Sequence, residues 1–281
     1  MTRRRYGALL GALGLAWALL VGAHAPARAE QAPRAAGRTL VWSDEFNGAT
    51  GAAPDPKRWR HVLDGQGHGN NELEYYTADP ANAALDGAGH LQITARPADP
   101  AAGLTCWYGP CQYTSARLDT DGLFSAAAPG RFEARMKLPC GTGLWPAFWA
   151  LGTRTDQIGW PDGGEIDVME NLGNETGTVH SALHGPGGFQ DVSAYSLPGS
   201  RQFCDDYHVF AVDRQVDRLS FSVDGKVRHT VLQSQAGWRW VFDEPFFLVL
   251  NLAVGGDWPG PPDDTTVFPA VLSVDYVRAY R

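Results

Sequence analysis

Hydrophobic and polar residues alternate in short runs along most of the chain from residue 38 onward. A β-strand sends successive side chains to opposite faces of a sheet, so this alternation is typical of half-buried strands. One run ends in Asp224-Gly225, a hairpin signal, and the residues after it are expected to form the return strand. The predicted strands, which include one buried run and one terminal run, are 91–95, 131–137, 218–223, 226–228, 246–252 and 273–280.

No segment of the sequence predicts an amphipathic helix of any length, and no linker or repeat interrupts residues 38–281. The chain contains 33 Gly and 19 Pro, which mark turns between short strands. These features predict an all-β sandwich of two antiparallel sheets. Sheets of this size can curve, and the concave face of a curved sheet is a natural groove for an extended polymer.

Three carboxylates lie within residues 165–170, and the residues between them are apolar: Ile166, Val168 and Met169. Ile and Val favour a strand, which places Glu165 and Asp167 on one face. Simple alternation would send Glu170 to the other face. One extra residue bulging near Val168-Met169 would return Glu170 to the face of the other two acids, so the sequence predicts a β-bulge there.

Three acids on one half-buried face repel one another and are costly to desolvate, so their pKa values should be pushed apart. Carboxyl groups in different protonation states suit glycoside hydrolysis, in which one attacks and another donates a proton. A solvated edge strand or a calcium loop is the structural alternative. We prefer catalysis, because the intervening residues are too apolar for a loop and edge strands usually interleave Lys or Thr.

The first 29 residues are predicted to be a secretory signal peptide. Arg3, Arg4 and Arg5 precede an apolar run from about residue 7 to residue 22, and Ala27-Arg28-Ala29 offers a cleavage site. The run is short for a membrane anchor, so we expect a secreted, extracellular protein with no membrane association. Residues 30–37 are expected to form a flexible tail, and 38–281 a single catalytic domain with ample chain to bury a core.

The mature chain is acidic. Cleavage after residue 29 removes four Arg and no acid, so 19 of the 23 basic residues remain against 31 acidic ones, a net charge near −12. That balance argues against nucleic acid or an anionic membrane as a partner and is compatible with a neutral substrate. We expect the protein to act as a monomer.

Four cysteines would meet an oxidising compartment after export, where disulfides form. Three pairings are open. We favour Cys106 with Cys111, because they close a short loop containing Gly109 and Pro110, and Cys140 with Cys204 as the second pair. A zinc site is the alternative, but no C-x-x-C spacing supports it.

Several motifs resemble, in order, those of one family. They are WSDEFNG at 42–48, GNNELEYYT at 69–77, YTSARL at 113–118, GLWPAFW at 143–149, GEIDVMEN at 164–171, HGPG at 184–187, NLAVGGDWPG at 251–260 and VDYVR at 274–278. This pattern is similar to the laminarinase-type members of glycoside hydrolase family 16, which are bacterial endo-β-1,3-glucanases. The likeness runs from about residue 40 to residue 281, nearly the whole mature chain.

The resemblance implies a concanavalin-like β-jelly-roll sandwich with a substrate cleft on its concave sheet, and hydrolysis with retention of anomeric configuration. By motif match, Glu165 is the expected nucleophile and Glu170 the general acid/base, with Asp167 between them and hydrogen-bonded to Glu165. A retaining pair must sit about 5–5.5 Å apart, so the bulge and the curvature are expected to draw the two groups together. The related lichenases have one residue fewer before the second Glu, so Met169 indicates the laminarinase type.

Sugar rings have apolar faces that stack on Trp. Trp145 and Trp149 lie four residues apart, which alternation places on one face, and we interpret them as lining the cleft. Trp160 precedes the catalytic strand and is expected to form a cleft wall, while Trp258 lies in a Gly/Pro-rich loop and is assigned to a subsite. An ordinary core Trp is the alternative for each. The other tryptophans of the mature chain are expected to be structural: Trp42, Trp59, Trp107, Trp238 and Trp240.

Three polar residues are further substrate-binding candidates. Asn71 and Arg117 match family positions that contact sugar hydroxyls on the non-reducing side, although Asn in a turn often serves only the backbone. His184 lies in a segment that could form the strand next to the acids, where its imidazole could bond the substrate or Glu170; a satisfied structural His is the alternative. His180 and His184 lack the Glu of a zinc-protease helix, so no cofactor is expected for catalysis.

Laminarinases of this type often carry a structural calcium on the convex side, and the resemblance implies such a site at Glu45 and Asp275. These residues come from opposite ends of the chain, but terminal strands of such sandwiches often pair. An acidic side chain with backbone carbonyls suits calcium. A solvated or Lys-paired Asp275 is the alternative.

The expected function is a secreted endo-β-1,3-glucanase (laminarinase) acting on β-1,3-glucan, with mixed-linked β-1,3/1,4-glucan as a further candidate substrate. One alternative is a non-catalytic β-glucan-binding protein on the same scaffold, but such relatives usually lack one or more of the three acids. Another alternative keeps the chemistry and changes the polymer to agar, carrageenan or xyloglucan. Sulfated substrates would call for a basic cleft, which the net charge does not suggest.

Overall fold

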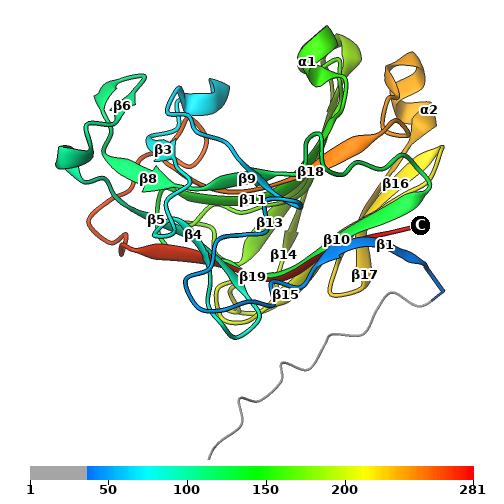
Figure 1. The fold of residues 1–281 in the computed structure, drawn as a ribbon. Helices are drawn as coiled ribbons and strands as arrows, with labels where there is room; N and C mark the ends of the chain where they lie inside the picture. Colours follow the sequence, from blue (N-terminus) through cyan, green and yellow to red (C-terminus); the bar gives the residue numbers. More distant parts are fainter. Residues whose placement is uncertain (1–36) are drawn as a thin grey trace, which may run out of the picture. The chain divides into compact units, whose positions relative to one another are not determined.

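Two large β-sheets pack face to face in the computed structural model, which describes residues 37–281 (Figure 1). The ten-stranded sheet consists of β1 Leu40–Asp44, β3 Glu74–Tyr76, β4 Ala83–Leu85, β5 Leu91–Pro97, β8 Tyr113–Ser115, β10 Gly130–Lys137, β15 His208–Arg214, β16 Arg218–Val223, β17 Lys226–Leu232 and β19 Ala270–Tyr280. Its order is β17-β16-β15-β10-β19-β5-β8-β3, with β1 paired to β19 and β4 to β5. The pairing of β1 with β19 joins the first and last strands, as expected.

The seven-stranded sheet has the order β14-β13-β12-β11-β18-β9-β2. Its strands are β2 Arg60–His61, β9 Arg117–Asp119, β11 Leu144–Gly152, β12 Glu165–Glu170, β13 Thr178–Gly185, β14 Phe189–Ser196 and β18 Phe246–Val254. A separate ribbon pairs β6 Thr105–Cys106 with β7 Gly109–Pro110. The helical segments are single turns: α1 Thr155–Ile158, α2 Gln233–Ala236, η1 Gly67–Gly69, η2 Pro100–Ala102, η3 Pro186–Gly188 and η4 Gly237–Arg239.

The predicted strands are all present, as β5, β10, β16, β17, β18 and β19. Asp224 and Gly225 connect β16 to β17 with positive φ angles of 50° and 71°, which is the backbone of a two-residue hairpin turn. Gly tolerates this conformation, and Asp is among the few other residues that adopt it. The all-β class and the antiparallel sandwich predicted from the alternation are therefore confirmed.

The core lies between the two sheets and is built by alternation along the strands. On β11 and β18, the fully buried side chains that face the core include Phe148, Ala150, Leu248, Leu250 and Leu252. Full burial of one large apolar side chain contributes about 1.5–3 kcal/mol. The residues between them, including Trp149 and Asn251, face the other side of the seven-stranded sheet, where the cleft described below lies.

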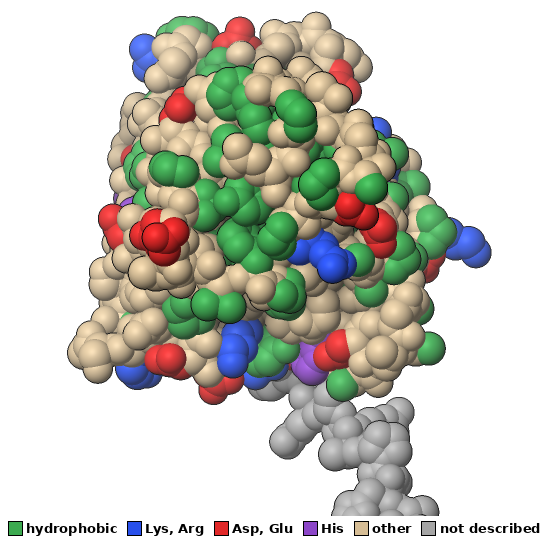
Figure 2. All heavy atoms as spheres, turned by 90° about the vertical axis from the view of Figure 1, so that its left-hand side faces the viewer, with side chains coloured by type: hydrophobic (Ala, Val, Ile, Leu, Met, Phe, Trp, Pro, Cys, Tyr) green, Lys and Arg blue, Asp and Glu red, His purple; other side chains and the backbone are tan. Residues whose placement is uncertain are grey.

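Both predicted disulfides are present: Cys106 is bonded to Cys111 and Cys140 to Cys204. The first closes the β6–β7 ribbon, which contacts β3. Figure 2 faces the side of Figure 1 that carries β3, β6 and β8, and it shows hydrophobic side chains gathered down the middle of this face. The β6–β7 ribbon therefore lies against β3 on this side of the sandwich.

The predicted signal peptide and all but the last residue of the predicted tail lie outside the described residues. Within residues 37–281, no helix has the length and apolar character needed to cross a bilayer.

Candidate active site

A β-bulge in β12 brings the three acids to one face. Asp167 pairs with Ala182 of β13 while Glu170 pairs with His180, so three steps along β12 match two along β13. The bulge was predicted at this place. The Ser181 hydroxyl donates to the Val168 carbonyl over 3.0 Å and satisfies a backbone group at the bulge. Val168 itself points into the core, together with Met169.

The acids lie in the middle of a cleft of about 680 Å³ on the outer face of the seven-stranded sheet. Alternate residues of β11, namely Trp145, Ala147, Trp149 and Leu151, form part of its floor. The floor continues across the sheet to Arg117 on β9 in one direction and to Gln190 and Val192 on β14 in the other. The cleft thus crosses the strands and extends to both sides of the acids.

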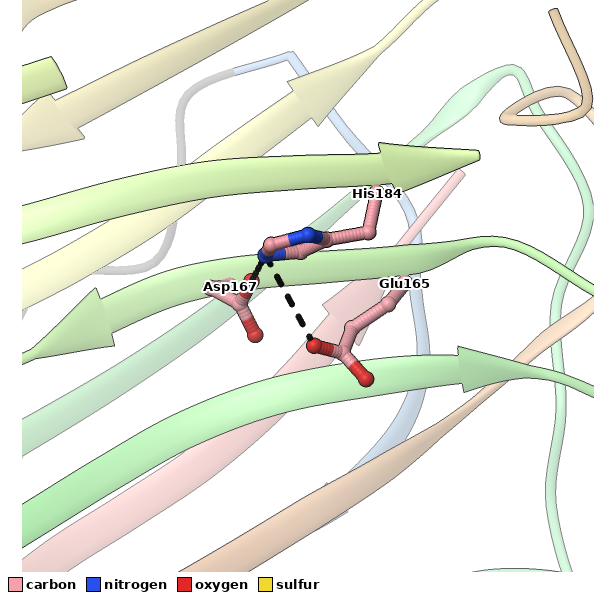
Figure 3. A group of neighbouring side chains, drawn as sticks. All are labelled: Glu165, Asp167 and His184. Carbon is pink, nitrogen blue, oxygen red and sulfur yellow. Dashed lines mark ion pairs between the residues drawn. The ribbon is translucent and has the colours of Figure 1, made fainter. Parts of the chain in front are cut away.

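Each of the two glutamates accepts a hydrogen bond from an indole. Trp160 Nε1 donates to Glu165 Oε2 and Trp145 Nε1 donates to Glu170 Oε1, both over 3.1 Å. His184 reaches in from β13, with Nε2 3.3 Å from Asp167 Oδ2 and 3.9 Å from Glu165 Oε1 (Figure 3). The imidazole therefore contacts Asp167 and Glu165, and not Glu170 as one form of the prediction had it.

Burial raises the pKa values of these acids above those of carboxyl groups exposed to water. Desolvation, with a smaller contribution from Asp167, raises the pKa of Glu165 to about 8, and His184, the Trp160 indole and Arg117 oppose this rise. Desolvation also raises the pKa of Asp167 to about 8. The pKa of Glu170 is raised well above its ordinary value by burial and then by the charges of Asp167 and Glu165. Glu165 has three groups that favour its charged form and Glu170 has two, so Glu170 is the better suited of the pair to hold a proton.

The comparisons with known proteins agree on one family. The sequence profile of the glycosyl hydrolases family 16 matches residues 74–278. This chain belongs to glycosyl hydrolase family 16. It is a glycoside hydrolase, and the alternative of a non-catalytic binding protein is set aside.

Relatives and solved structures support that assignment over most of the chain. The beta-glucanase of Rhodothermus marinus is 41% identical over 256 residues, which cover 86% of this chain and 85% of that protein. The endo-beta-1,3-glucanase structure from Pyrococcus furiosus is 44% identical with a TM-score of 0.79, covering 86% of this chain and 94% of the other. The laminarinase catalytic domain of Thermotoga maritima is 42% identical with a TM-score of 0.79, covering 87% and 98%. The predicted concanavalin-like jelly roll is confirmed by this likeness.

Most of the predicted substrate-binding residues of this family 16 hydrolase line the cleft together: Arg117, Trp145, Trp149, Trp160, His184 and Trp258. The Arg117 guanidinium lies 4.7 Å from the centre of the Trp149 ring. Trp258 is packed edge-on against Trp145, with ring centres 5.5 Å apart, and against His180, 4.9 Å apart. Their roles toward sugar stay predictions, but the structure gathers them at one site.

Asn71 is placed differently. Its side chain is exposed and donates to both carboxylate oxygens of Asp257, over 2.9 and 3.0 Å, and it is not among the residues that line the cleft. Asn71 has a φ of 55°, so it turns its side chain away while its neighbours Asn70 and Glu72 face the cleft. The bond to Asp257 braces the loop that carries Trp258, and this placement gives no support to direct sugar binding by Asn71.

Sequence reasoning missed several residues that line the cleft, among them Asn251 and three residues of one loop: His68, Asn70 and Glu72. A signal existed for Asn251, because it is the single polar residue in the apolar run 246–252. Trp149 Nε1 donates to Asn251 Oδ1 over 2.8 Å, so this amide fixes an aromatic ring of the floor. The others lie in a loop with several positive φ angles, where alternation does not predict side-chain direction.

The prediction that the remaining tryptophans are structural holds for those in or against the core, which are Trp42, Trp59 and Trp240. Trp107 is 45% exposed, but its Nε1 donates to the Glu72 carbonyl over 2.7 Å and so holds the segment just before β3. Trp238 is 75% exposed and lies outside the core, with the Arg239 guanidinium 5.3 Å from its ring centre.

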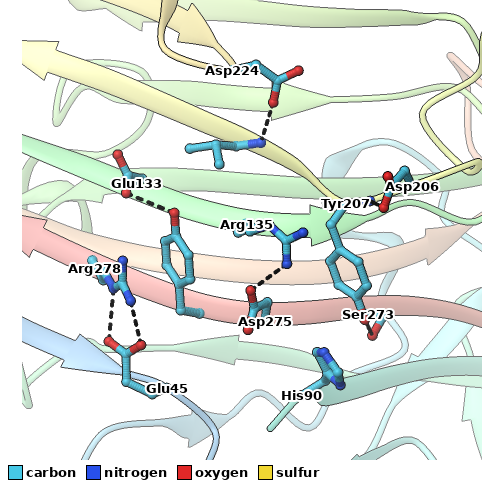
Figure 4. Close-up of polar contacts among 12 residues, drawn as sticks. Glu45, His90, Glu133, Arg135, Asp206, Tyr207, Asp224, Ser273, Asp275 and Arg278 are labelled. Atoms are coloured by element: carbon cyan, nitrogen blue, oxygen red, sulfur yellow. Dashed lines mark hydrogen bonds and ion pairs between the residues drawn. The ribbon is translucent and has the colours of Figure 1, made fainter. Parts of the chain in front are cut away.

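The residues predicted to hold calcium each have another partner. Glu45 accepts two bonds from Arg278, with distances of 3.0 and 2.8 Å, and Asp275 lies 2.6 Å from Arg135 Nη1 (Figure 4). With their carboxylates held by guanidinium groups, these two side chains do not form a common cation site in this arrangement. The structural calcium stays a prediction that would require other oxygens.

One group in the described residues has the composition of a metal site. Donor atoms of Glu165, Asp167 and His184 all lie within 4.8 Å of one another. The chemistry of paired carboxylates in glycoside hydrolysis needs no metal, and the His184 ring supplies a polar partner to both acids. That no cofactor is required for catalysis stays a prediction.

Proposed function

We propose that this family 16 hydrolase is a secreted endo-β-1,3-glucanase that acts with retention of configuration. The observation that carries the proposal is the bulge in β12, which aims Glu165 and Glu170 into one cleft from a single strand. The names of the relatives support the substrate, because they are described as a beta-glucanase, an endo-beta-1,3-glucanase and a laminarinase.

In the first step, Glu170 donates its proton to the glycosidic oxygen while the Glu165 carboxylate attacks the anomeric carbon. The bond from that carbon to the leaving sugar breaks, and a covalent glycosyl ester forms on Glu165. In the second step, Glu170 takes a proton from water, and the water oxygen displaces Glu165 from the same carbon. The indoles of Trp160 and Trp145 hold the two carboxyl groups in place for these steps.

Asp167 and His184 are proposed to tune this pair. Asp167 adds negative charge next to Glu165 and Glu170 and favours the protonated form of both. His184, within 4 Å of Asp167 and Glu165, offsets part of that repulsion when it carries a proton. Glu165, Asp167 and Glu170 can therefore carry fewer than three negative charges between them. Double displacement requires this, because one carboxyl group must hold a proton while another is ionised.

The shape and charge of the cleft favour internal cleavage of a neutral polymer. It extends from Arg117 on β9 past the acids to Val192 on β14, so sugar units can be bound on both sides of the scissile bond. Among the described residues that line it, Arg117 is the one Arg or Lys. A sulfated polysaccharide would need more positive charge than this. The secretory leader predicted at 1–29 and the two disulfides support export to an oxidising compartment.

The test is hydrolysis over a panel of laminarin, mixed-linked β-glucan, agar and xyloglucan by the wild type, Glu165→Gln and Glu244→Gln. Glu244 is an exposed acid outside the cleft and makes a matched control. We expect the wild type and the control to release oligosaccharides from laminarin with the β-anomer formed first, and Glu165→Gln to release none. Early α-anomer, an active Glu165→Gln, or preference for agar or xyloglucan would each contradict the proposal.

A further inference from the structure

Two more acids lie buried at the β3 side of the cleft: Glu72, which also lines the cleft, and Glu74 behind it. Glu72 is 5% exposed and Glu74, on β3, is fully buried. Their carboxyl groups lie close enough for one to donate to the other, which requires a proton on one of them. Glu74 Oε2 accepts the Val254 amide over 2.6 Å, while Glu74 Oε1 is buried and accepts no bond. A proton on Glu74 Oε1, donated to Glu72, satisfies that oxygen.

A chain of hydrogen bonds connects this pair to the cleft. Trp149 Nε1 donates to Asn251 Oδ1 over 2.8 Å, and Asn251 Nδ2 donates to Tyr76 Oη over 3.1 Å. Tyr76 Oη in turn donates to Glu72 Oε2 over 3.0 Å.

The direction of this chain is fixed at its cleft end. An indole nitrogen can only donate, so the Asn251 oxygen must face Trp149 and its NH₂ must face Tyr76. The single hydroxyl proton of Tyr76 is then directed to Glu72 Oε2, and Asn70 Nδ2 donates to Glu72 Oε1 over 3.3 Å. Because both of its oxygens accept, Glu72 is favoured as the ionised partner. Glu74 is left as the protonated partner, which agrees with its unpaired Oε1.

The surroundings of the pair favour a single shared negative charge. Burial, and then the charge of Glu72, raise the pKa of Glu74 well above its ordinary value. The other titratable groups that face the pair are Tyr76, Arg117 and His68 on the cleft side and Tyr108 on the ribbon side. Arg117 is the one permanent cation among them, and it lies over the Trp149 ring at the other end of the chain.

The β6–β7 ribbon holds the backbone of this segment. Tyr108 Oη donates to the Leu73 carbonyl over 2.6 Å, and Trp107 donates to the Glu72 carbonyl. The segment that carries both acids is therefore fixed from outside by the ribbon that the Cys106–Cys111 bond closes.

We propose that Glu72 and Glu74 are a positioning pair that shares one proton and, through Tyr76 and Asn251, fixes Trp149 beneath Arg117 to bind the glucan on the β9 side of the cleft. The inference rests on the proposed function, because it assigns a role in binding the same polymer. The pair touches no reacting atom; it acts on the floor that the sugar ring would contact.

The experiment measures kcat and KM on laminarin for Glu74→Met, Glu74→Gln, Tyr76→Phe and Tyr75→Phe. Glu74→Met cannot donate to Glu72, and Tyr76→Phe cuts the chain, so each should raise KM by about tenfold and lower kcat by less than about threefold, as expected for lost substrate binding. Glu74→Gln keeps a donor toward Glu72 and should restore KM to within about twofold of wild type. Tyr75 lies on the opposite face of β3, and Tyr75→Phe is the matched control.

Coupling and spectroscopy complete the test. Combining Glu74→Met with Tyr76→Phe should raise KM no further than either substitution alone, because both break the same chain of hydrogen bonds.

In an infrared difference spectrum at neutral pH, without substrate, Glu74→Gln should lose the carbonyl band of a protonated carboxyl group. Unchanged KM in Tyr76→Phe, a Glu74→Gln as impaired as Glu74→Met, or loss of a carboxylate band instead would overturn the proposal. The spectrum tests the shared proton even if the wild type proves inactive on laminarin, which would refute the proposed function separately.

Discussion

The two outer faces of this sandwich carry acids in opposite surroundings. On the ten-stranded sheet, acids are matched with arginines: Glu45 with Arg278 and Asp275 with Arg135 (Figure 4), and likewise Glu133 with Arg131. On the seven-stranded sheet, Glu165 and Asp167 meet the His184 imidazole (Figure 3), and Glu165 and Glu170 each meet an indole. Within residues 37–281, no guanidinium forms an ion pair with these three acids.

This difference separates structural acids from functional ones. A carboxylate bonded to a guanidinium is satisfied and inert, since its charge is neutralised where it stands. The acids of the cleft lack that compensation, and burial raises the pKa values of all three. Acids that resist ionisation can hold and release protons near neutral pH, which is what hydrolysis of an acetal requires.

The largest effect is expected when the same substitution is made on each face. Glu170→Gln removes the proton donor and should lower kcat on laminarin by about 10²–10⁴-fold. Glu133→Gln, on the arginine-paired face, should leave kcat within about twofold. The loss in Glu170→Gln should shrink on an aryl glycoside whose leaving group needs no protonation. Equal losses on both substrates would contradict the acid role of Glu170.

A smaller effect concerns the dependence of stability on pH. An acid with a raised folded-state pKa keeps its proton after the unfolded chain has lost it, so its contribution to stability falls as pH rises from about 4 toward its folded value. For Asp167 that value is about 8. The quantity to compare is the unfolding free energy of Asp167→Asn minus that of the wild type. This difference should be about 1–3 kcal/mol larger at pH 8 than at pH 4.5.

The control for that measurement is Asp275→Asn, which leaves Arg135 without its carboxylate. It should lower stability at pH 8, the opposite sign to Asp167→Asn. Denaturant unfolding at the two pH values checks both variants. A stability gain for Asp167→Asn that does not change with pH would show that its pKa is not raised.

The smallest expected effect is on the bulge. Ser181→Ala removes the donor to the Val168 carbonyl and should cost about 1 kcal/mol of unfolding free energy. Because the bulge sets the direction of Glu170, kcat should fall by about three- to tenfold. Ser193→Ala, on the neighbouring strand β14, is the matched control. Loss of stability with full kcat would mean that the rest of β12 fixes the acids without this bond.

The sequence predicted the parts of the site that follow from alternation. Glu165, Asp167 and Glu170 could share a face only with one extra residue between them, and the bulge lies where that argument placed it. Trp145 and Trp149 share a face for the same reason.

Alternation does not describe loops. Asn71, with a positive φ, points away from the cleft while Asn70 and Glu72 face it, and no periodic pattern predicts that reversal. The burial of Glu74 was equally hidden, because an acid in a short strand is expected to face solvent, whereas here it lies against β18 and accepts the Val254 amide. Contacts between segments distant in sequence decided both cases.

The central claim is that Glu165 attacks the anomeric carbon, and trapping the glycosyl ester tests it most directly. The protein would be treated with a laminari-oligosaccharide carrying fluorine at C2 and a good leaving group, digested, and its peptides mapped by mass spectrometry. We predict one added glycosyl group, carried by Glu165. A label on Glu170 or Asp167, or turnover with inverted configuration and no ester, would contradict the account.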